Sequence, residues 1–175
     1  MIHRASILAS SSLALMLVAC GGDDGGLGSA SDAFKASIQA SCEKAFACMS
    51  SYDAAMNNNT PFAESYGASV SDCVAQTTAL INQFLGADYF AKLDASVAAG
   101  RVDYNAADAE TCLDAGSAQS CDQFFGQNGA MYTPPAACDT AIRGTVATGG
   151  TCTIEEDCSV SADSCDETSM TCMPG

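Results

Sequence analysis

The sequence predicts a mainly α-helical fold: a small bundle of about four helices, stapled by disulfides and followed by a short Cys-rich module of loops and short β-strands. Between residues 32 and 143, apolar residues recur every three or four positions, which is the period of amphipathic helices. Residues 144–175 instead hold four cysteines and few large apolar residues, so they cannot build a core of their own and rely on cystines. We therefore expect a helical domain over 32–143 and a terminal module over 144–175.

The first helix is expected to start at Ser31-Asp32, and its apolar stripe has helical spacing. The stripe consists of Phe34, Ile38, Cys42, Ala45, Phe46 and Met49. Residues 57–67 are predicted to be a loop, because three Asn residues and Pro61 interrupt the pattern. A second helix is expected from a cap at Ser69 or Ser71 to the stop at Gly86.

Two further helices follow in the same pattern. The third is expected from about Asp88 to Ala99, and the fourth from about Asn105 to Ala115, with a stop at Gly116. Pro134-Pro135 predicts extended chain and the end of the helical region.

The amino terminus has the features of a removable signal. A short basic start precedes about a dozen apolar residues, too few to span a bilayer of roughly 30 Å. The sequence Leu17-Val18-Ala19-Cys20 that follows resembles the lipobox of bacterial lipoproteins at every position. The resemblance implies that residues 1–19 are a signal peptide and that Cys20 is lipidated. The alternative is an ordinary secretory signal cut after Ala19, which would leave Cys20 as a free thiol.

Residues 20–31 are expected to form the lipidated cysteine and a flexible, Gly-rich tether. Gly21 and Gly22 follow Cys20, so the second mature residue is not the Asp that retains lipoproteins at the inner membrane in the best-known sorting rule. This favours anchoring in the outer membrane, with the globule on its periplasmic or its cell-surface face.

Ten cysteines remain when Cys20 is set aside, an even number that suits a disulfide framework in an oxidising compartment. The candidates are Cys42, Cys48, Cys73, Cys112, Cys121, Cys138, Cys152, Cys158, Cys165 and Cys172. No two are spaced Cys-x-x-Cys, which argues against thioredoxin-like redox sites, zinc ribbons and simple iron–sulfur sites.

An antiparallel hairpin of the first two helices would bring Cys48, near the end of one, close to Cys73, near the start of the other. Cys42 would then reach Cys112 on the fourth helix. The remaining expected bridges are Cys121–Cys138, Cys152–Cys165 and Cys158–Cys172. Ten cysteines allow on the order of a thousand pairings, so these are expectations chosen among many.

Composition excludes several functions. The formal net charge is −15 and becomes about −16 when the signal is removed, because Arg4 is lost with it and no acid is. A chain this acidic is repelled by nucleic acid. The acidity suits a solvated surface or, alternatively, an acidic binding face. The only histidine is His3, inside the signal, so the mature chain lacks Ser-His-Asp and Cys-His catalysis and His-ligated zinc.

Beyond the lipobox, much of the mature chain resembles the Cys-rich lipoproteins of myxobacteria and related bacteria. The segments that carry the resemblance are 42–48, 100–105 followed by Ala109, 112–115 with Cys121, 137–139, 143–144, 150–152 and 157–158. The four terminal cysteines have the spacing of a short Dickkopf-like Cys module. The resemblance implies a fold and a cellular address, and it adds almost nothing about activity.

Calcium is the one cofactor for which the sequence offers candidates. The acidic cluster in the terminal module contains Glu155, Glu156, Asp157 and Asp163, with Asp166 and Glu167 nearby. Carboxylates in loops are the ligands that calcium prefers, although exposed charge on a loop explains the cluster as well. A second acidic stretch, 103–114, has Asp108 where a calcium loop needs Gly and Asp114 where it needs Glu, so it better fits a capped helix.

Taken together, these features favour a non-catalytic binding or interaction protein, anchored to the membrane by lipid and directed at a protein or glycan partner. A structural envelope lipoprotein is the alternative. A protease-inhibitor-like domain, marked by a protruding loop between cystines, or a hydrolase that uses paired carboxylates, is less favoured.

Overall fold

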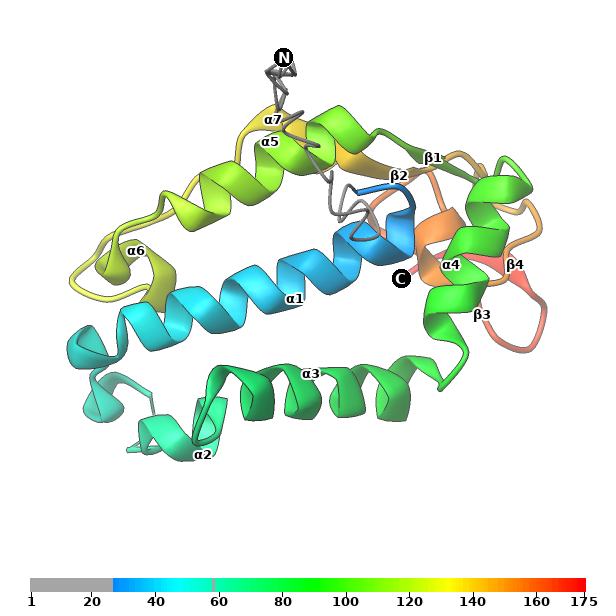
Figure 1. Cartoon of the computed structure of the whole chain (residues 1–175). Coiled ribbons are helices and arrows are strands. Elements are labelled where there is room, and N and C mark those ends of the chain that lie inside the picture. Colours follow the sequence, from blue (N-terminus) through cyan, green and yellow to red (C-terminus); the bar gives the residue numbers. More distant parts are fainter. Residues whose placement is uncertain (1–26, 58) are drawn as a thin grey trace, which may run out of the picture.

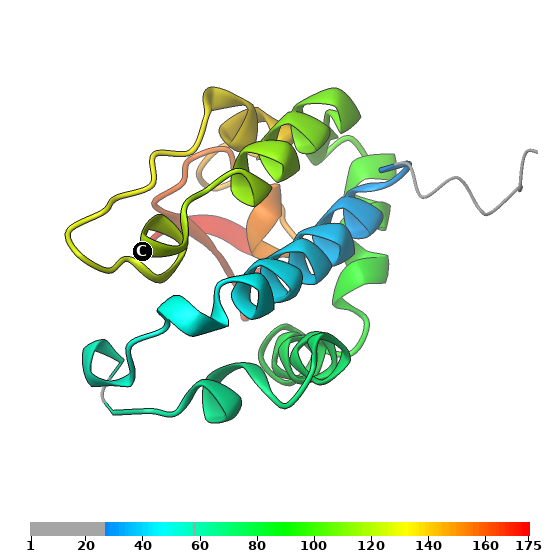
Figure 2. The same cartoon turned by 60° about the vertical axis from the view of Figure 1, so that its left-hand side comes forward.

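The computed structural model describes residues 27–57 and 59–175, and its longest helix, α1 (Ala30–Ala47), lies at the centre of the fold. Helix α3 (Val70–Leu85) runs antiparallel along one side of α1, and α5 (Ala106–Ser117) runs along the other (Figures 1 and 2). Helix α4 (Tyr89–Ala98) crosses the end where α1 begins (Figure 1). The expected mainly α-helical, cystine-stapled chain is confirmed.

Side-chain caps explain where the long helices begin. The hydroxyl of Ser29 accepts a hydrogen bond from the Asp32 amide, so α1 starts two residues earlier than predicted. Ser69 caps α3 in the same way, as expected. Asn105 caps α5 by accepting from the amides of Ala107 and Asp108, which confirms that this stretch is a capped helix.

Three short helices lie outside the four helices that the sequence predicted. They are α2 (Phe62–Tyr66), α6 (Cys121–Phe125) and α7 (Ala136–Ala141). Helices of five or six residues complete fewer than two turns, so no apolar period is visible in their sequence. Pro135 occupies the cap of α7 with a φ of −67°, so the proline pair precedes a helix instead of excluding one.

Two small antiparallel sheets complete the fold. Strand β1 (Val102–Tyr104) pairs with β2 (Ile142–Gly144), and β3 (Asp163–Asp166) pairs with β4 (Thr171–Pro174). Strand β2 spans the boundary expected between residues 143 and 144. A Cβ at Gly144 would clash with the backbone carbonyl of Cys158, so the terminal segment lies directly against β2.

The terminal segment also contributes to the helical core. Ile154 packs with Ala30 of α1 and Leu93 of α4 in one buried cluster. At the other boundary, Leu27 is buried against Ala33 and Ala109, although the sequence placed it in the tether. Both ends of the described chain are thus packed onto α1 and its neighbours.

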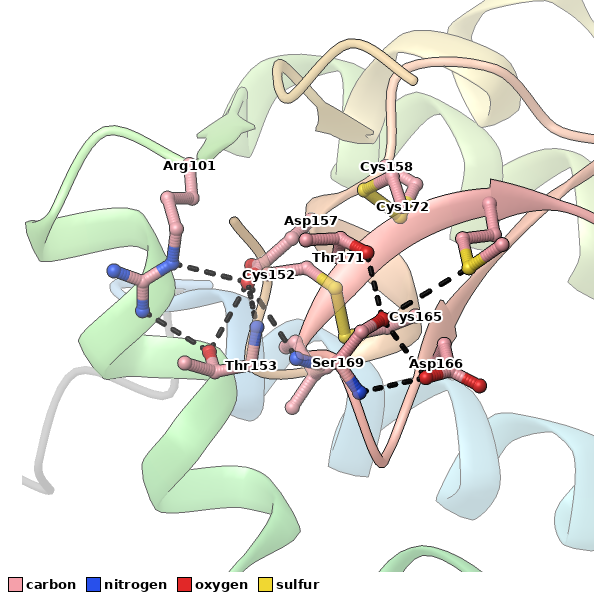
Figure 3. The surroundings of a disulfide bond; sticks show 12 residues. Arg101, Cys152, Thr153, Asp157, Cys158, Cys165, Asp166, Ser169, Thr171 and Cys172 are labelled. Carbon is pink, nitrogen blue, oxygen red and sulfur yellow. Dashed lines mark hydrogen bonds and ion pairs between the residues drawn. A yellow bond between two sulfur atoms is a disulfide. The ribbon is translucent and has the colours of Figure 1, made fainter. Parts of the chain in front are cut away.

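All ten candidate cysteines form disulfides. The terminal pairs Cys152–Cys165 and Cys158–Cys172 agree with the expectation and link the loops around β3 and β4 (Figure 3). The other three expected pairs are wrong. The structure has Cys42–Cys73, Cys48–Cys121 and Cys112–Cys138 in place of Cys48–Cys73, Cys42–Cys112 and Cys121–Cys138.

The helical hairpin itself was predicted correctly, but the wrong cysteine of α1 was assigned to it. Cys42 shares a buried face with Ile38, and this face meets Cys73 on α3. Cys48 lies just beyond α1, at its C-cap, and there bonds to Cys121 at the start of α6. The chain between α1 and α3 forms short 3-10 turns and α2, so the hairpin has no tight turn that would align the two helix ends.

No helix in the described part of the chain is long and apolar enough to cross a membrane.

Peptide mapping without reduction tests the corrected bridges. Trypsin cleaves after Lys and Arg, which places the first six of these cysteines in peptides 36–44, 45–92 and 102–143. We expect one covalent complex of all three peptides. Cys42 in peptide 36–44 bonds to Cys73 in peptide 45–92, and Cys48 in that peptide bonds to Cys121 in peptide 102–143. The C-terminal peptide keeps its bridges internal and should be released alone, which serves as the control. Recovery of free peptide 45–92 would contradict the assignment.

Candidate functional site

The candidate site is an apolar cavity of about 290 Å³ between α1, α5 and the chain that follows α6. Helix α1 lines it with Ser37, Ala40, Ser41 and Lys44, which lie on one face because their spacing is i, i+3, i+4, i+7. The volume is close to the lower end of the range typical of small-molecule sites. The cavity is therefore large enough for a compact ligand.

Small side chains create this space. Nearer its start, α1 packs closely on α5, where Ala33 and Ala109 are buried together. Further along, α1 presents Ser37, Ala40 and Ser41 before Lys44, and α5 presents Gly116 and Ser117. The two helices run side by side (Figure 1), so the missing side-chain volume opens a cavity between them.

The third wall is the chain between α6 and α7, which contributes Tyr132 and Pro134. Its ends are held by Cys48–Cys121 and Cys112–Cys138, and the second of these cystines also lines the cavity. Gln127 is buried. In the amide orientation that satisfies both of its polar atoms, the side-chain nitrogen donates to the Ser51 carbonyl at 2.6 Å. The wall is thus fixed at both ends and within its length.

Tyr132 brings an unsatisfied polar group to this site. Its hydroxyl is buried and has no hydrogen-bond partner among the described residues. Leaving a buried hydroxyl unpaired costs about 1–3 kcal/mol, so such groups are rare in proteins. The hydroxyl is closed off from water-sized molecules, so it does not face the open space of the cavity.

Lys44 is the only charged residue among those described as lining the cavity. Its ammonium donates to the carbonyl of Ser117, the last residue of α5, at 3.0 Å. Lys44 also lies in the last turn of α1, so it faces the negative ends of two helix dipoles. These backbone groups favour a cation here, and no carboxylate within the described chain forms an ion pair with it.

A second, smaller cavity of about 150 Å³ adjoins the first along α5. The two share Ser37, Cys112, Leu113 and Cys138 as lining residues. The smaller cavity is otherwise lined by apolar side chains of α1, α5, α7 and β2. The site thus has a polar region at Lys44 and an apolar region towards Ala109.

None of the described lining residues is Asp, Glu or His. Sequence reasoning missed the site. The available signal was the spacing of Ser37, Ala40, Ser41 and Lys44 on the side of α1 opposite its large apolar residues, but a solvent-exposed helix face has the same pattern.

In the described chain, no three of the calcium candidates bring their carboxylate oxygens within 4.8 Å of one another. Glu155, Glu156 and Asp163 line a separate, open hollow of about 650 Å³, while Asp157 is fully buried. Asp163 accepts from the Thr148 hydroxyl, and Glu156 accepts from the Tyr89 hydroxyl at 2.6 Å.

In the described regions, the only three potential metal ligands that lie within 4.8 Å of one another are Cys152, Cys158 and Cys172, and all three are in disulfides. The lipidation candidate Cys20 lies outside the described residues.

Asp157 instead forms a buried ion pair that joins the terminal segment to α4 (Figure 3). Its Oδ2 accepts from Arg101 Nε at 3.0 Å and from the Thr153 amide at 2.7 Å. Arg101 in turn donates to the Ser96 hydroxyl at 3.1 Å. Asp157 was expected to be an exposed loop charge or a calcium ligand, and the structure corrects this because Arg101 already supplies the cation.

The environment of Asp157 sets the sign of its contribution to stability. Burial acts to raise its pKa, but hydrogen bonds from Ser96, Thr153 and Arg101 outweigh burial and hold the pKa below its usual value. A carboxyl with a lowered folded-state pKa stabilises the fold above its unfolded pKa of about 3.9. That contribution is complete at neutral pH and is lost as the pH falls through the folded-state pKa.

Comparisons with known proteins identify no relative: no family model, curated protein or solved structure matches this chain.

We expect Arg101→Met to destabilise the fold by about 3–5 kcal/mol, because it leaves a buried carboxylate without its cation. Equilibrium chemical denaturation at pH 7 measures the change. Arg143→Met is the matched control, since the Arg143–Asp103 pair is exposed on both sides and should contribute less than about 1 kcal/mol. Equal effects of the two substitutions would contradict the assignment of Arg101.

Proposed function

We propose that this protein is a lipid-anchored, non-catalytic binding protein of the outer cell envelope, and that its ligand site is the cavity between α1, α5 and the chain after α6. One observation carries the proposal: the cavity combines mostly apolar walls with Lys44, a lysine that has no carboxylate partner among the described residues. A mostly apolar pocket with a few converging polar groups is the usual form of a small-molecule site.

The address rests on the sequence and is supported by the cystines. The lipobox-like Leu17-Val18-Ala19-Cys20 supports lipid attachment at Cys20. Gly21-Gly22 after it supports anchoring in the outer membrane. Five disulfides suit an oxidising compartment beyond the inner membrane. Two or three acyl chains suffice for stable anchoring, whereas a single chain does not.

A rigid frame suits recognition of a ligand. The cavity is walled by two long helices and by a segment that two cystines hold in place. Binding to a site already in its bound shape avoids the cost of ordering loops and side chains. The proposed role is therefore capture of a compact ligand at the cell envelope, without conversion of that ligand.

We expect 1-hexanol, a neutral apolar probe, to bind this cavity. Saturation-transfer difference NMR on the purified protein should show transfer to the alkyl chain, and Ala40→Phe should abolish it because the ring fills the cavity. Ala91→Phe, on an exposed position of α4, is the matched control and should retain transfer. No transfer in the wild type, or equal transfer in Ala40→Phe, would overturn the proposed site.

The proposed anchor is tested separately. Metabolic labelling with a tagged fatty acid should mark the wild-type chain in a bacterial host that processes lipoproteins, and Cys20→Ser should remove the label and release the protein from membranes. External protease on intact cells, with lysed cells as control, then reports which face carries the globule. Labelling that persists in Cys20→Ser would exclude lipidation at this residue.

Contact with a protein partner is a second candidate function. Leu80 and Phe84 lie one turn apart on α3 with 52% and 74% of their surface exposed, and Leu85 beside them is also exposed. Apolar side chains gathered in this way favour contact with another surface. A glycan partner stays a prediction from the sequence.

A further inference from the structure

A separate cleft of about 260 Å³ lies between the end of α3, the start of α4 and the terminal segment. Its lining includes Phe84, Leu85 and Met170, which are 74%, 44% and 40% exposed. The cleft therefore gathers large exposed apolar side chains from two distant parts of the chain. Apolar side chains gathered in this way favour contact with another molecule, and Phe and Met are enriched at protein interfaces.

The same cleft carries negative charge. Glu155, Glu156 and Glu167 line it, and Lys92 is the one cation among the described lining residues. Lys92 already forms an ion pair with Asp88 at 3.1 Å. Glu156 accepts a hydrogen bond within the fold, and its other carboxylate oxygen is buried, so it adds charge without an accessible acceptor. Glu155 and Glu167 are exposed, and neither forms an ion pair with a described cation.

Charge decides which partner fits the cleft. A second copy of this chain would bring further acidic surface to the glutamates, because the net charge is −15. An anionic membrane or a nucleic acid would be repelled for the same reason. A protein segment that carries cationic side chains beside an apolar one complements both the exposed apolar residues and the unpaired carboxylates.

We propose that this cleft docks a basic segment of another protein. An apolar side chain of the partner packs on Phe84, Leu85 and Met170. Lysines or arginines beside it pair with Glu155 and Glu167. This inference rests on the second candidate function, contact with a protein partner, and names the chemistry of that partner. The flexible thioether of Met170 can adapt to the shape of the partner, and the acidic surface attracts a cationic one.

Three blocked peptides with a central Leu-Phe pair test the partner class. One has two lysines on each side, and the others have glutamines or glutamates in their place. Affinities come from NMR titration of the purified protein at pH 7 and low salt. The lysine peptide should bind about tenfold more tightly than the glutamine peptide, and added salt should reduce this preference. The glutamate peptide should bind most weakly. Equal binding of the lysine and glutamine peptides would overturn the basic partner and leave a neutral contact surface.

Phe84→Ser tests the apolar contact. Because this side chain is 74% exposed, its loss should leave the fold intact while weakening the lysine and glutamine peptides at least about tenfold. Met131→Ser is the matched control, since Met131 is 85% exposed on the chain after α6 and does not line the cleft. It should bind both peptides as the wild type does. Equal weakening by the two substitutions would contradict docking at this cleft.

Paired glutamate substitutions test the charge. Glu155→Gln combined with Glu167→Gln should remove most of the preference for the lysine peptide. Binding of the glutamine peptide should stay unchanged, which also shows that the cleft is still folded. Glu64→Gln combined with Glu110→Gln makes the same change of charge at exposed positions of α2 and α5, away from the cleft, and should keep the preference. Equal loss in both double variants would overturn the role of the cleft carboxylates, since only a general charge effect would remain.

The other occupants are tested with the Cys20→Ser protein, from which the proposed lipid anchor is removed. A dimer seen in analytical ultracentrifugation, or binding to phosphatidylcholine vesicles, would overturn the basic partner if Phe84→Ser abolished it. If none of the three peptides bound the wild-type protein, the second candidate function would itself fail. Binding of 1-hexanol reports on the cavity between α1 and α5 independently, so the failures are distinguishable.

Discussion

The cystines organise this fold because the apolar core consists mostly of small side chains. Buried alanines and half-cystines outnumber the large buried apolar residues, so much of the fully buried apolar surface belongs to small side chains. Helix α1 is the centre of the covalent framework: Cys42 ties it to α3, and Cys48, just beyond its end, ties it to α6. Each bridge restricts the unfolded chain and stabilises the fold by roughly 2–4 kcal/mol.

The same covalent framework explains how the cavity persists. Space inside a protein is normally closed by packing, because unfilled volume costs stability. Here the wall that carries Tyr132 lies between cystines to α1 and to α5, so it is held in place without filling the space. The small residues of α1 and α5 then leave the cavity lined but not filled. A site on covalently fixed elements is well suited to recognition of one ligand shape.

Charge is divided between two roles. Most acidic groups are solvated and keep the surface negative, whereas Asp157 is buried and joins the terminal segment to Arg101 beside α4. Four described cations are paired with carboxylates, and this leaves Lys44 as the cation at the cavity. Lys44 thus gives the cavity a positive position on a chain whose net charge is −15.

Local signals by themselves determined the mainly α-helical class, the four long helices with most of their caps, and the two interleaved cystines of residues 152–172. Each of these features depends on neighbours within a few residues or on short loops. Only the tertiary structure decided the other three bridges, since the offset between α1 and α3 depends on how the intervening turns pack. It alone decided the cavity as well. A stripe of Ser, Ala and Lys on a helix looks the same in sequence whether it faces water or a second helix, and the position of α5 makes it the wall of a site.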